Sequence, residues 1–268
     1  MTDARYDLIG DMLDWEIFDQ VRNFHAKTQN VLLHGSPKKE RLSEAYKAKI
    51  GLLEHSDIPI TPFEEGRVHL GRFSKDFEIT RNPSATHFGG KLLPYEALSN
   101  FLKVSFGETR IQEERPFRNY PSGGALYSVQ VIVGIRPTRF LKDASFSAAF
   151  YHYRPHLHVL DFLAACDENV MVEAVLNKES KGLSSFSFAI FYVCFLPKVL
   201  CKYDYRGYRL SLLEAGSMYQ QASQFGKNLG LTNRVWSFFE DQRICHLLKL
   251  NPVSYYPLIA QIFGDSDV

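Results

Sequence analysis

The stretch VQVIVGI, residues 129–135, limits the possible folds of this chain more than any other feature of its sequence. Its three valines alternate with a glutamine and an isoleucine, so both faces of a strand here are largely apolar. Such a strand belongs inside a sheet whose two faces are both packed. We therefore expect a central sheet with other elements layered against it.

Helices and strands alternate along the rest of the chain. Apolar residues at spacings of three and four predict the helices, and runs rich in aromatic and β-branched residues predict the strands. Helices are expected at 12–28, 94–107, 159–176 and 208–229, and strands at 150–153, 186–196 and 255–264. Because the alternation has no strict βαβ rhythm, we expect an α+β fold.

The sequence also predicts a loop, the position of the last strand in the sheet and the buried face of the long helix. Residues 108–121 are charged and carry two prolines, which is typical of a loop. Pro257 suggests that the last strand lies at an edge or starts unpaired. The long helix is expected to bury one stripe, made of Leu212, Ala215, Tyr219, Ala222, Phe225 and Leu229.

Composition narrows the classes of function. Lys and Arg total 31 against 30 Asp and Glu, so the chain lacks the basic excess that non-specific nucleic-acid binding needs. No apolar run approaches the roughly 18 residues of a membrane span, and the first residues do not resemble a signal peptide. The four cysteines form no CxxC pair and are typical of reduced thiols. We expect a cytoplasmic protein that binds neither nucleic acid nor a membrane.

Common catalytic motifs are missing from the sequence. There is no GxGxxG, GxxxxGK[ST], HExxH or GxSxG, so a nicotinamide Rossmann site and a P-loop are unsupported. His152, His156 and His158 stand close together in YHYRPHLH, but no acidic residue or cysteine completes a convincing metal set. We interpret these histidines as part of a strand and turn, and we expect no metal site.

The stretch KYDYRGYR, residues 202–209, combines basic side chains with tyrosines. A lysine or tyrosine can transfer a proton if neighbours or burial lower its pKa. Arg206 and Arg209 could hold a phosphate through paired hydrogen bonds, and the start of the following helix also favours an anion. The same residues could instead form a basic aromatic loop that precedes the long helix.

The stretch PSGGALY, residues 121–127, stands directly before the valine strand. Glycine has no Cβ, so its backbone can approach a planar cofactor or a phosphate closely. Taken alone, the stretch is also typical of a plain turn.

These stretches occur in a fixed order: PSGGALY, YHYRP, KYDYRGYRLSLLEAGSMYQQA and GLTNRVW. The series resembles the SagB-type azoline dehydrogenases, a branch of the nitroreductase superfamily, and within it the dehydrogenase subunit of microcin-B-type thiazole/oxazole synthetases. The earlier stretch NFHAKTQN resembles the opening segment of that family. The resemblance implies a nitroreductase-like α+β fold, with a mainly antiparallel sheet flanked by helices, and a homodimer with FMN at the subunit interface.

The resemblance also implies an activity. Such enzymes oxidise thiazoline or oxazoline rings in a leader-bearing, ribosomally made precursor peptide, beside cyclodehydratase subunits that form the rings. The catalytic Lys-Tyr pair of the family falls on Lys202 and Tyr203. The residues expected at the cofactor are Arg81, Ser84, Ser122, Gly123, Gly124, Arg206, Arg209, Asn233 and Arg234.

One stretch departs from the superfamily pattern. Nitroreductases usually carry an Arg-Arg-Ser-x-Arg-like motif at the flavin, and the matching stretch here is TRNPSATHF. Arg81 and Ser84 replace part of it, but Pro83 and Thr86 stand where arginines are expected. This leaves Arg206 or Arg209 to compensate.

The expected domain organisation is an N-terminal helical, partner-contacting segment over residues 1–70 and an FMN-binding domain over residues 71–268. Two other functions stay open from the sequence. One is a general NAD(P)H-dependent nitroreductase or quinone reductase, which would not need the Lys-Tyr pair. The other is a non-catalytic scaffold subunit of a synthetase. The departure of residues 80–88 from the flavin-binding motif is the reason to consider it.

Overall fold

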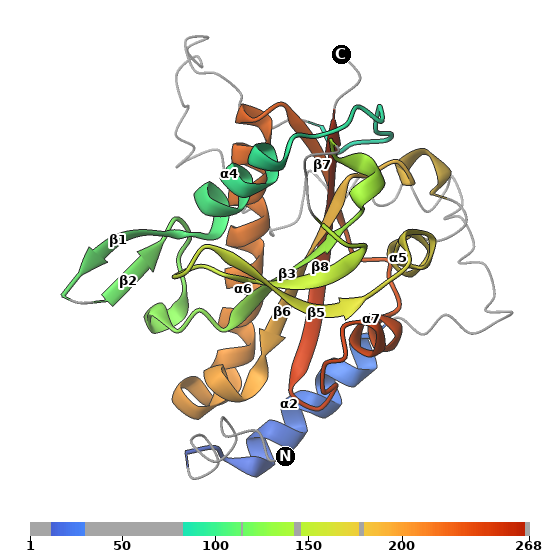
Figure 1. The fold of residues 1–268 in the computed structure, drawn as a ribbon. Coiled ribbons are helices and arrows are strands. Elements are labelled where there is room, and N and C mark those ends of the chain that lie inside the picture. The colour runs from blue at the N-terminus through green and yellow to red at the C-terminus, as the bar shows by residue number, and fades with distance from the viewer. Residues whose placement is uncertain (1–11, 30–82, 114, 142–145, 177–179, 266–268) are drawn as a thin grey trace, which may run out of the picture. The chain divides into compact units, whose positions relative to one another are not determined.

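The computed structural model describes residues 12–29, 83–113, 115–141, 146–176 and 180–265. Its centre is a six-stranded sheet in the order β5-β4-β3-β6-β8-β7, accompanied by a two-stranded sheet of β1 and β2 (Figure 1). All neighbouring strands in both sheets pair antiparallel. The strands are β1 (Glu108–Gln112), β2 (Arg115–Arg118), β3 (Val129–Ile135), β4 (Ala149–Arg154), β5 (Val159–Ala165), β6 (Phe188–Phe195), β7 (Leu231–Trp236) and β8 (Tyr255–Asp265).

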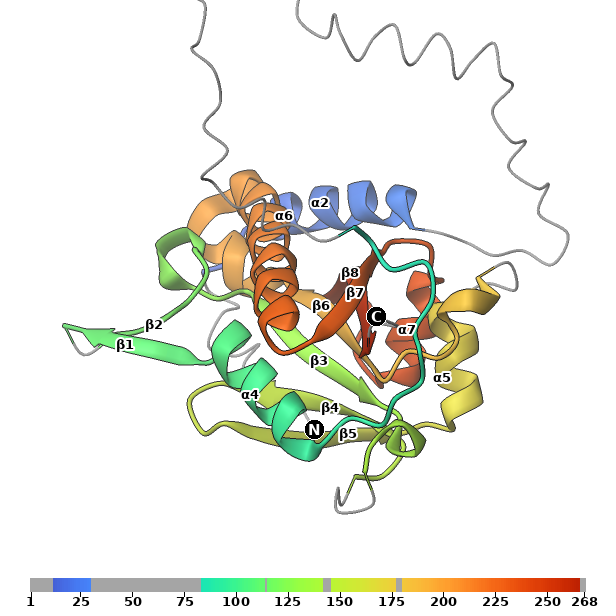
Figure 2. The same cartoon turned by 90° about the horizontal axis from the view of Figure 1, so that it is seen from above.

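Helices cover both faces of the large sheet (Figure 2). They are α2 (Trp15–Thr28), α4 (Tyr95–Phe106), α5 (Glu168–Val175), α6 (Leu196–Asn228) and α7 (Asp241–Leu247). Side chains of α4 and α6 pack with alternate residues of β3 in one core cluster. Side chains of α5 and α7 pack in a second cluster on the opposite face. The expected α+β fold, with a mainly antiparallel sheet flanked by helices, is confirmed.

The valine strand lies where its sequence predicts. β3 is paired on one side with β4 and on the other with β6, from Val129 opposite Cys194 to Ile135 opposite Phe188. Val131 and Val133 point into the cluster with α4 and α6, and Ile132 points into the cluster with α5 and α7. All of β6 is buried as well. A strand covered on both faces needs this apolar pattern, because an unpaired polar side chain there would lose its hydration.

Helix α2 packs against the start of α6. Asp14 caps it, since its carboxylate accepts hydrogen bonds from the backbone N–H groups of Glu16 and Ile17 at 2.9 and 3.2 Å. Phe18 and Val21 face a small cluster that includes residues of α6 and β8. The helix expected over 12–28 is therefore confirmed, with its first turn shortened by the cap.

Helix α6 differs from its expected form. It begins at Leu196, well before residue 208, and it bends at Asp204, whose φ of 46° and ψ of −140° are not helical. Its buried stripe is also rotated, because Leu212 is 44% exposed while Glu214 is 2% exposed. The spacing of apolar residues could not predict this rotation, because the residue that turns inward, Glu214, is a carboxylate held by its own hydrogen bonds.

Three further expectations are wrong. Residues 108–121 are not a loop but contain the hairpin of β1 and β2. Residues 159–176 are not one helix: they hold strand β5, whose mostly exposed residues lack a clear alternation, and then α5. Strand β8 is not at an edge, because it lies between β6 and β7. Pro257 is tolerated there because the register with β6 shifts between Tyr192 and Val193, opposite the proline.

The division at residue 70 stays a prediction, because residues 30–82 lie outside the described part of the chain. Within the described residues, no helix is both long enough and apolar enough to cross a membrane.

Candidate functional site

Two stretches singled out by the sequence meet in space. The glycine turn Gly123–Ala125 precedes β3, and Lys202 and Tyr203 lie on the first part of α6. Gly124 has a φ of 58°, and a Cβ built on it would collide with Tyr203 Oη and lie 2.7 Å from Lys202 Nζ. The turn needs glycine at this position for two reasons: its backbone conformation is left-handed, and two polar side chains reach over it.

A buried carboxylate holds the glycine turn in place. Glu214 of α6 accepts hydrogen bonds from Ser122 Oγ at 2.7 Å, Ser128 Oγ at 3.3 Å and the backbone N–H of Val129 at 3.1 Å. Ser122 Oγ in turn accepts one from the backbone N–H of Tyr127 at 2.8 Å. Burial raises the pKa of Glu214 above its ordinary value, and the hydrogen bonds that it accepts oppose this shift. The Ser122 hydroxyl is therefore used in hydrogen bonds that fix the turn. A cofactor at the turn would contact the backbone of Ser122 and not its hydroxyl.

Lys202 and Tyr203 differ in their exposure to solvent. Lys202 is exposed and Tyr203 is half-buried, and Lys202 Nζ lies 5.3 Å from the centre of the Tyr203 ring. The bend of α6 at Asp204 follows them directly. A non-glycine residue with a positive φ is costly unless its surroundings enforce it, and such residues concentrate at functional sites. The bend separates the short segment that carries the pair from the long straight part of α6.

A cavity of about 720 Å³ opens beside this turn. Its walls include Gly124, Lys202 and several residues of the β1–β2 hairpin. Arg118, the last residue of β2, lies 4.2 Å above the ring of Tyr127 and donates a hydrogen bond to Tyr120 Oη at 2.8 Å. Neither Arg118 nor Glu214 is among the site residues expected from the sequence. The signal for Glu214 was a single acidic residue in the otherwise apolar run LSLLEAG.

A second group of candidate residues lies around β7. The backbone N–H of Ala85 donates to the carbonyl of Asn233 at 2.9 Å, and Arg234 Nη1 donates to the carbonyl of Ala85 at 2.9 Å. These bonds hold the exposed Ser84 beside the strand. Asn233 Oδ1 accepts hydrogen bonds from Ser223 Oγ at 3.0 Å and Gln261 Nε2 at 2.8 Å. Its side chain is thus bound inward, whereas Ser84 faces solvent. Arg81 lies outside the described residues.

Within one chain, the two groups lie at opposite ends of α6. Lys202 and Tyr203 precede Gly207, while Ser223 binds the β7 group near the end of the helix. The helix between Gly207 and Ser223 is about 24 Å long at the usual rise per residue. Arg206 and Arg209 are exposed on the first part of α6, so in a single chain neither lies beside Ser84.

The three histidines do not converge. His152 Nε2 is hydrogen-bonded to Gln130 Oε1 at 3.2 Å. His158 is bonded to Tyr153 Oη at 2.8 Å and to Ser99 Oγ at 3.1 Å. No cluster of three or more His, Cys, Asp or Glu side chains suited to a metal occurs among the described residues.

No family model matches the sequence. The chain is 30% identical over 253 residues to the microcin B17-processing protein McbC of Escherichia coli, covering 94% of this chain and 92% of that protein. It is 25% identical over 187 residues to a nitroreductase-like protein of Methanocaldococcus jannaschii, covering 69% and 88%.

Solved structures give the same picture. A chain of the E. coli microcin synthetase McbBCD complex with truncated pro-MccB17 bound superposes with a TM-score of 0.80 and 27% identity, covering 98% of each chain. A nitroreductase-like protein of Ralstonia eutropha superposes with a TM-score of 0.56 and 18% identity, covering 73% of this chain and 88% of that one. The nitroreductase-like fold expected from the sequence is confirmed.

Proposed function

Because this chain belongs to the family of the microcin B17-processing protein McbC, we propose that it is an FMN-dependent dehydrogenase of a peptide-modifying synthetase. It oxidises thiazoline and oxazoline rings in a ribosomally made precursor peptide to thiazoles and oxazoles, as a step towards a microcin-like antibiotic. The single observation that carries the proposal is the contact of the Gly124 turn with Lys202 and Tyr203. Two motifs of the proposed family, PSGGALY and KYDYRGYR, thereby meet in a nitroreductase-like fold.

The residues at the turn fit a flat cofactor. A Cβ on Gly124 would collide with Tyr203 Oη and crowd Lys202 Nζ, so glycine is what lets these two side chains lie directly over the backbone of the turn. Ser122, Gly123 and Gly124 would offer backbone atoms to FMN, and Ser84, Asn233 and Arg234 would line its other end. FMN, when bound, supplies the acceptor for the hydride that leaves the ring.

The protein's own share of the reaction is proton transfer. Conversion of an azoline to an azole removes a hydride from one ring carbon and a proton from the adjacent α-carbon. Lys202 Nζ and Tyr203 Oη both lie at the glycine turn, so either group, in its deprotonated form, can accept that proton from a ring laid against the turn. Removal of the proton and of the hydride together accounts for the two hydrogens that the ring loses.

A homodimer completes the proposed site. The Gly124 group and the β7 group are separated by most of α6, so one bound FMN cannot contact both within one chain. A two-fold axis across α6 would bring the first group of one copy to the second group of the other. Leu212 and Leu213 support this arrangement, since both are exposed on α6 in spite of being apolar.

The proposed partners follow from the relative of known structure. That structure is of a synthetase complex with a truncated precursor bound. We expect this chain to work beside cyclodehydratase subunits that make the azolines, on a leader-bearing precursor peptide, in the bacterial cytoplasm.

The test uses the purified protein with an azoline-bearing peptide and the cyclodehydratase partners. We expect a yellow protein with about one FMN per chain, and mass spectrometry should show the loss of two hydrogens per ring. The double variant Lys202→Ala, Tyr203→Phe should keep its flavin and lose ring oxidation. Unchanged oxidation in this variant would show that the assigned site is wrong.

The flavin of the purified protein also distinguishes the two other functions, a general nitroreductase and a scaffold subunit. The likeness to the M. jannaschii protein favours a general nitroreductase as the second candidate. Rapid bleaching of the flavin by NADPH alone, without ring oxidation, would favour it. A colourless protein that takes up no FMN would favour a scaffold subunit.

A further inference from the structure

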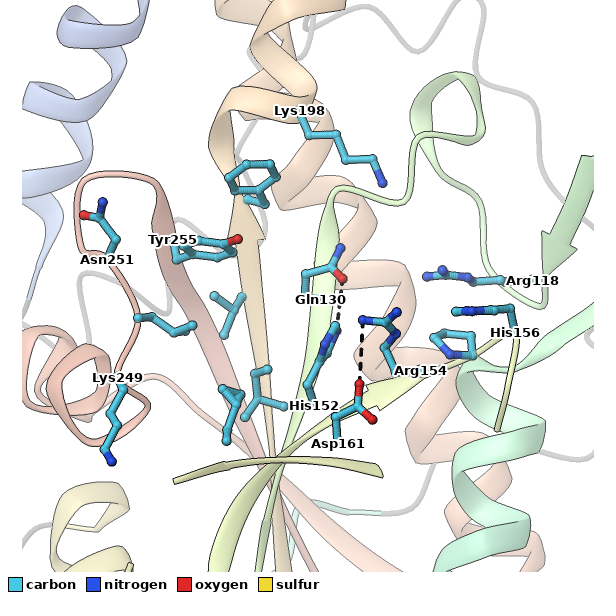
Figure 3. A pocket seen from close by; sticks show the side chains of 16 residues that line it. Arg118, Gln130, His152, Arg154, His156, Asp161, Lys198, Lys249, Asn251 and Tyr255 are labelled. Atoms are coloured by element: carbon cyan, nitrogen blue, oxygen red, sulfur yellow. Dashed lines mark hydrogen bonds and ion pairs between the residues drawn. The ribbon is translucent and has the colours of Figure 1, made fainter. Parts of the chain in front are cut away.

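A larger cavity opens on the other face of the sheet, at the end where α6 begins. Its volume is about 780 Å³, which is typical of ligand sites. Apolar side chains from four strands and a loop form its floor: Ile132, Leu163, Val193, Phe195, Leu250 and Tyr255. Figure 3 shows polar side chains around this floor, with Lys198 reaching in from α6 and Arg118, Arg154 and His156 gathered on one side.

The charges around the cavity are strongly unbalanced. Four basic side chains line it, namely Arg118, Arg154, Lys198 and Lys249, against the single carboxylate of Asp161. Arg154 Nη1 pairs with Asp161 Oδ2 at 3.6 Å. In the described part of the chain, neither Arg118 nor Lys198 forms an ion pair. The carboxylate of Glu214, bound to the glycine turn, attracts both of them without direct pairing.

Both cations are partly withdrawn from water. Lys198 Nζ donates only a long hydrogen bond, 3.4 Å, to the carbonyl of Tyr127. Burial and the charge of Arg118 lower the pKa of Lys198, and the carboxylate of Glu214 opposes this shift. Arg118 Nε is buried and has no hydrogen-bond partner among the described residues. Withholding water from like charges is costly unless an anion joins them. The positive end of the α6 dipole begins at Phe195 and adds to this field.

Arg118 also connects this cavity to the candidate site, because it lines both cavities. Lys198 lies one helical turn before Lys202. A small free anion could fill only one of the two cavities, whereas an extended chain could pass through both. The apolar floor also suits a peptide better than an inorganic anion.

We propose that this cavity binds acidic side chains of the extended peptide substrate while a ring of the same peptide lies at the Gly124 turn. The carboxylates pair with Arg118 and Lys198, and the intervening backbone and apolar side chains lie on the floor. This inference rests on the proposed function for the identity of the ligand as the substrate peptide. The cavity thereby selects substrates by charge at a distance from the reacting ring.

The test measures binding without turnover. The flavin-loaded full chain is titrated against a fluorescein-labelled peptide of alternating Glu and Gly, and against the same peptide with Gln for Glu, by fluorescence anisotropy. We expect the acidic peptide to bind at least about tenfold more tightly, because charge-assisted hydrogen bonds are stronger than neutral ones. Its affinity should fall as the salt concentration rises. Equal affinity for the Gln peptide would overturn the proposal.

A matched pair of variants locates the binding. Lys198→Gln should weaken binding of the acidic peptide about tenfold. Lys91→Gln makes the same change of charge on an exposed lysine that does not line the cavity, and it should leave the affinity unchanged. Flavin content and thermal unfolding verify that both variants fold. Equal weakening in the two variants would mean non-specific attraction and would reject the site.

A competition arm separates a peptide site from a simple anion site. Inorganic phosphate at constant ionic strength should not displace the acidic peptide, and displacement at equal concentration would overturn the assignment to a peptide. The proposed function can fail independently. If ring oxidation is never observed but the acidic peptide still binds through Lys198, the function is wrong and the cavity stands.

Discussion

At the scale of single residues, the site depends on positions where the side chain is small or its charge is buried. Gly124 leaves room that Lys202 and Tyr203 reach into, and Glu214 fixes the turn that carries the glycine. The two features are linked, because a turn held by three hydrogen bonds cannot relax to make room for a Cβ. A substitution at Gly124 is therefore expected to disturb the site more than the core.

Gly124→Val tests this expectation. A β-branched residue with a positive φ costs about 1–2 kcal/mol, and its side chain would also push Lys202 and Tyr203 away from the turn. We expect most of the flavin to be lost, as measured by absorbance per chain, while the unfolding temperature falls only slightly.

Gly230→Val is the matched control. Gly230 follows α6 and also has a positive φ, 73°, but a Cβ there would meet no atom within 4 Å. This variant should keep its flavin. Full flavin and normal activity in Gly124→Val would instead show that PSGGALY is a plain turn with no role at the cofactor.

At the scale of elements, the sequence predicted the parts that are buried on regular faces. Strands β3 and β6 and helices α2 and α4 lie close to their expected positions because their apolar residues recur with the period of the element. Strand β5 was mistaken for a helix because an edge strand needs no regular apolar face.

The candidate site was predictable to a lesser degree. The sequence series pointed to Gly124, Lys202 and Tyr203, and the fold brings them together. It could not show that Ser84 and Asn233 lie far along α6 from them, since this distance depends on tertiary packing. Arg118 and Lys198 were missed because isolated basic residues carry no motif, and only the shared cavity wall makes them notable.

The docking of α2 on α6 is expected to depend on pH. His25 is 4% exposed, bonds through Nδ1 to Tyr208 Oη at 2.9 Å, and stacks on Tyr256. Burial lowers the pKa of His25 from 6.5 to about 4. Between these values the unfolded chain binds more protons than the folded one, so the contribution of His25 is present above pH 6.5 and is lost as the pH falls to about 4.

We therefore expect hydrogen exchange in α2 to accelerate as the pH falls from 6.5 to about 4, after correction for the intrinsic exchange rate. His25→Gln should remove this part of the pH dependence, because glutamine does not titrate. His246→Gln, at an exposed histidine of α7, should keep it. If the His25 variant retained the full pH dependence, another group would control the docking.

At the scale of the whole molecule, α6 connects everything that the proposed reaction needs. It carries the Lys-Tyr pair near its start, the buried Glu214 in its middle and Ser223 beside β7 near its end. Because it also exposes leucines, the same helix is the expected contact between two copies of the chain. Assembly and cofactor binding should therefore fail together.

Leu213→Glu tests this coupling. Leu213 is 68% exposed, so the change should leave the isolated fold intact but place a charge in the proposed interface. We expect a monomer by light scattering and a parallel loss of flavin. Leu157→Glu, at an exposed leucine in the turn after β4, should remain dimeric and yellow. A monomeric Leu213 variant with full flavin would show that one chain holds the cofactor alone.

The position of Arg118 has one more consequence. A single guanidinium at the end of β2 borders two cavities. Any ligand that draws this group to itself changes the free energy of binding in the neighbouring cavity, and thermodynamic reciprocity requires the second ligand to act back by the same factor. The hairpin that carries Arg118 would therefore couple binding in one cavity to binding in the other.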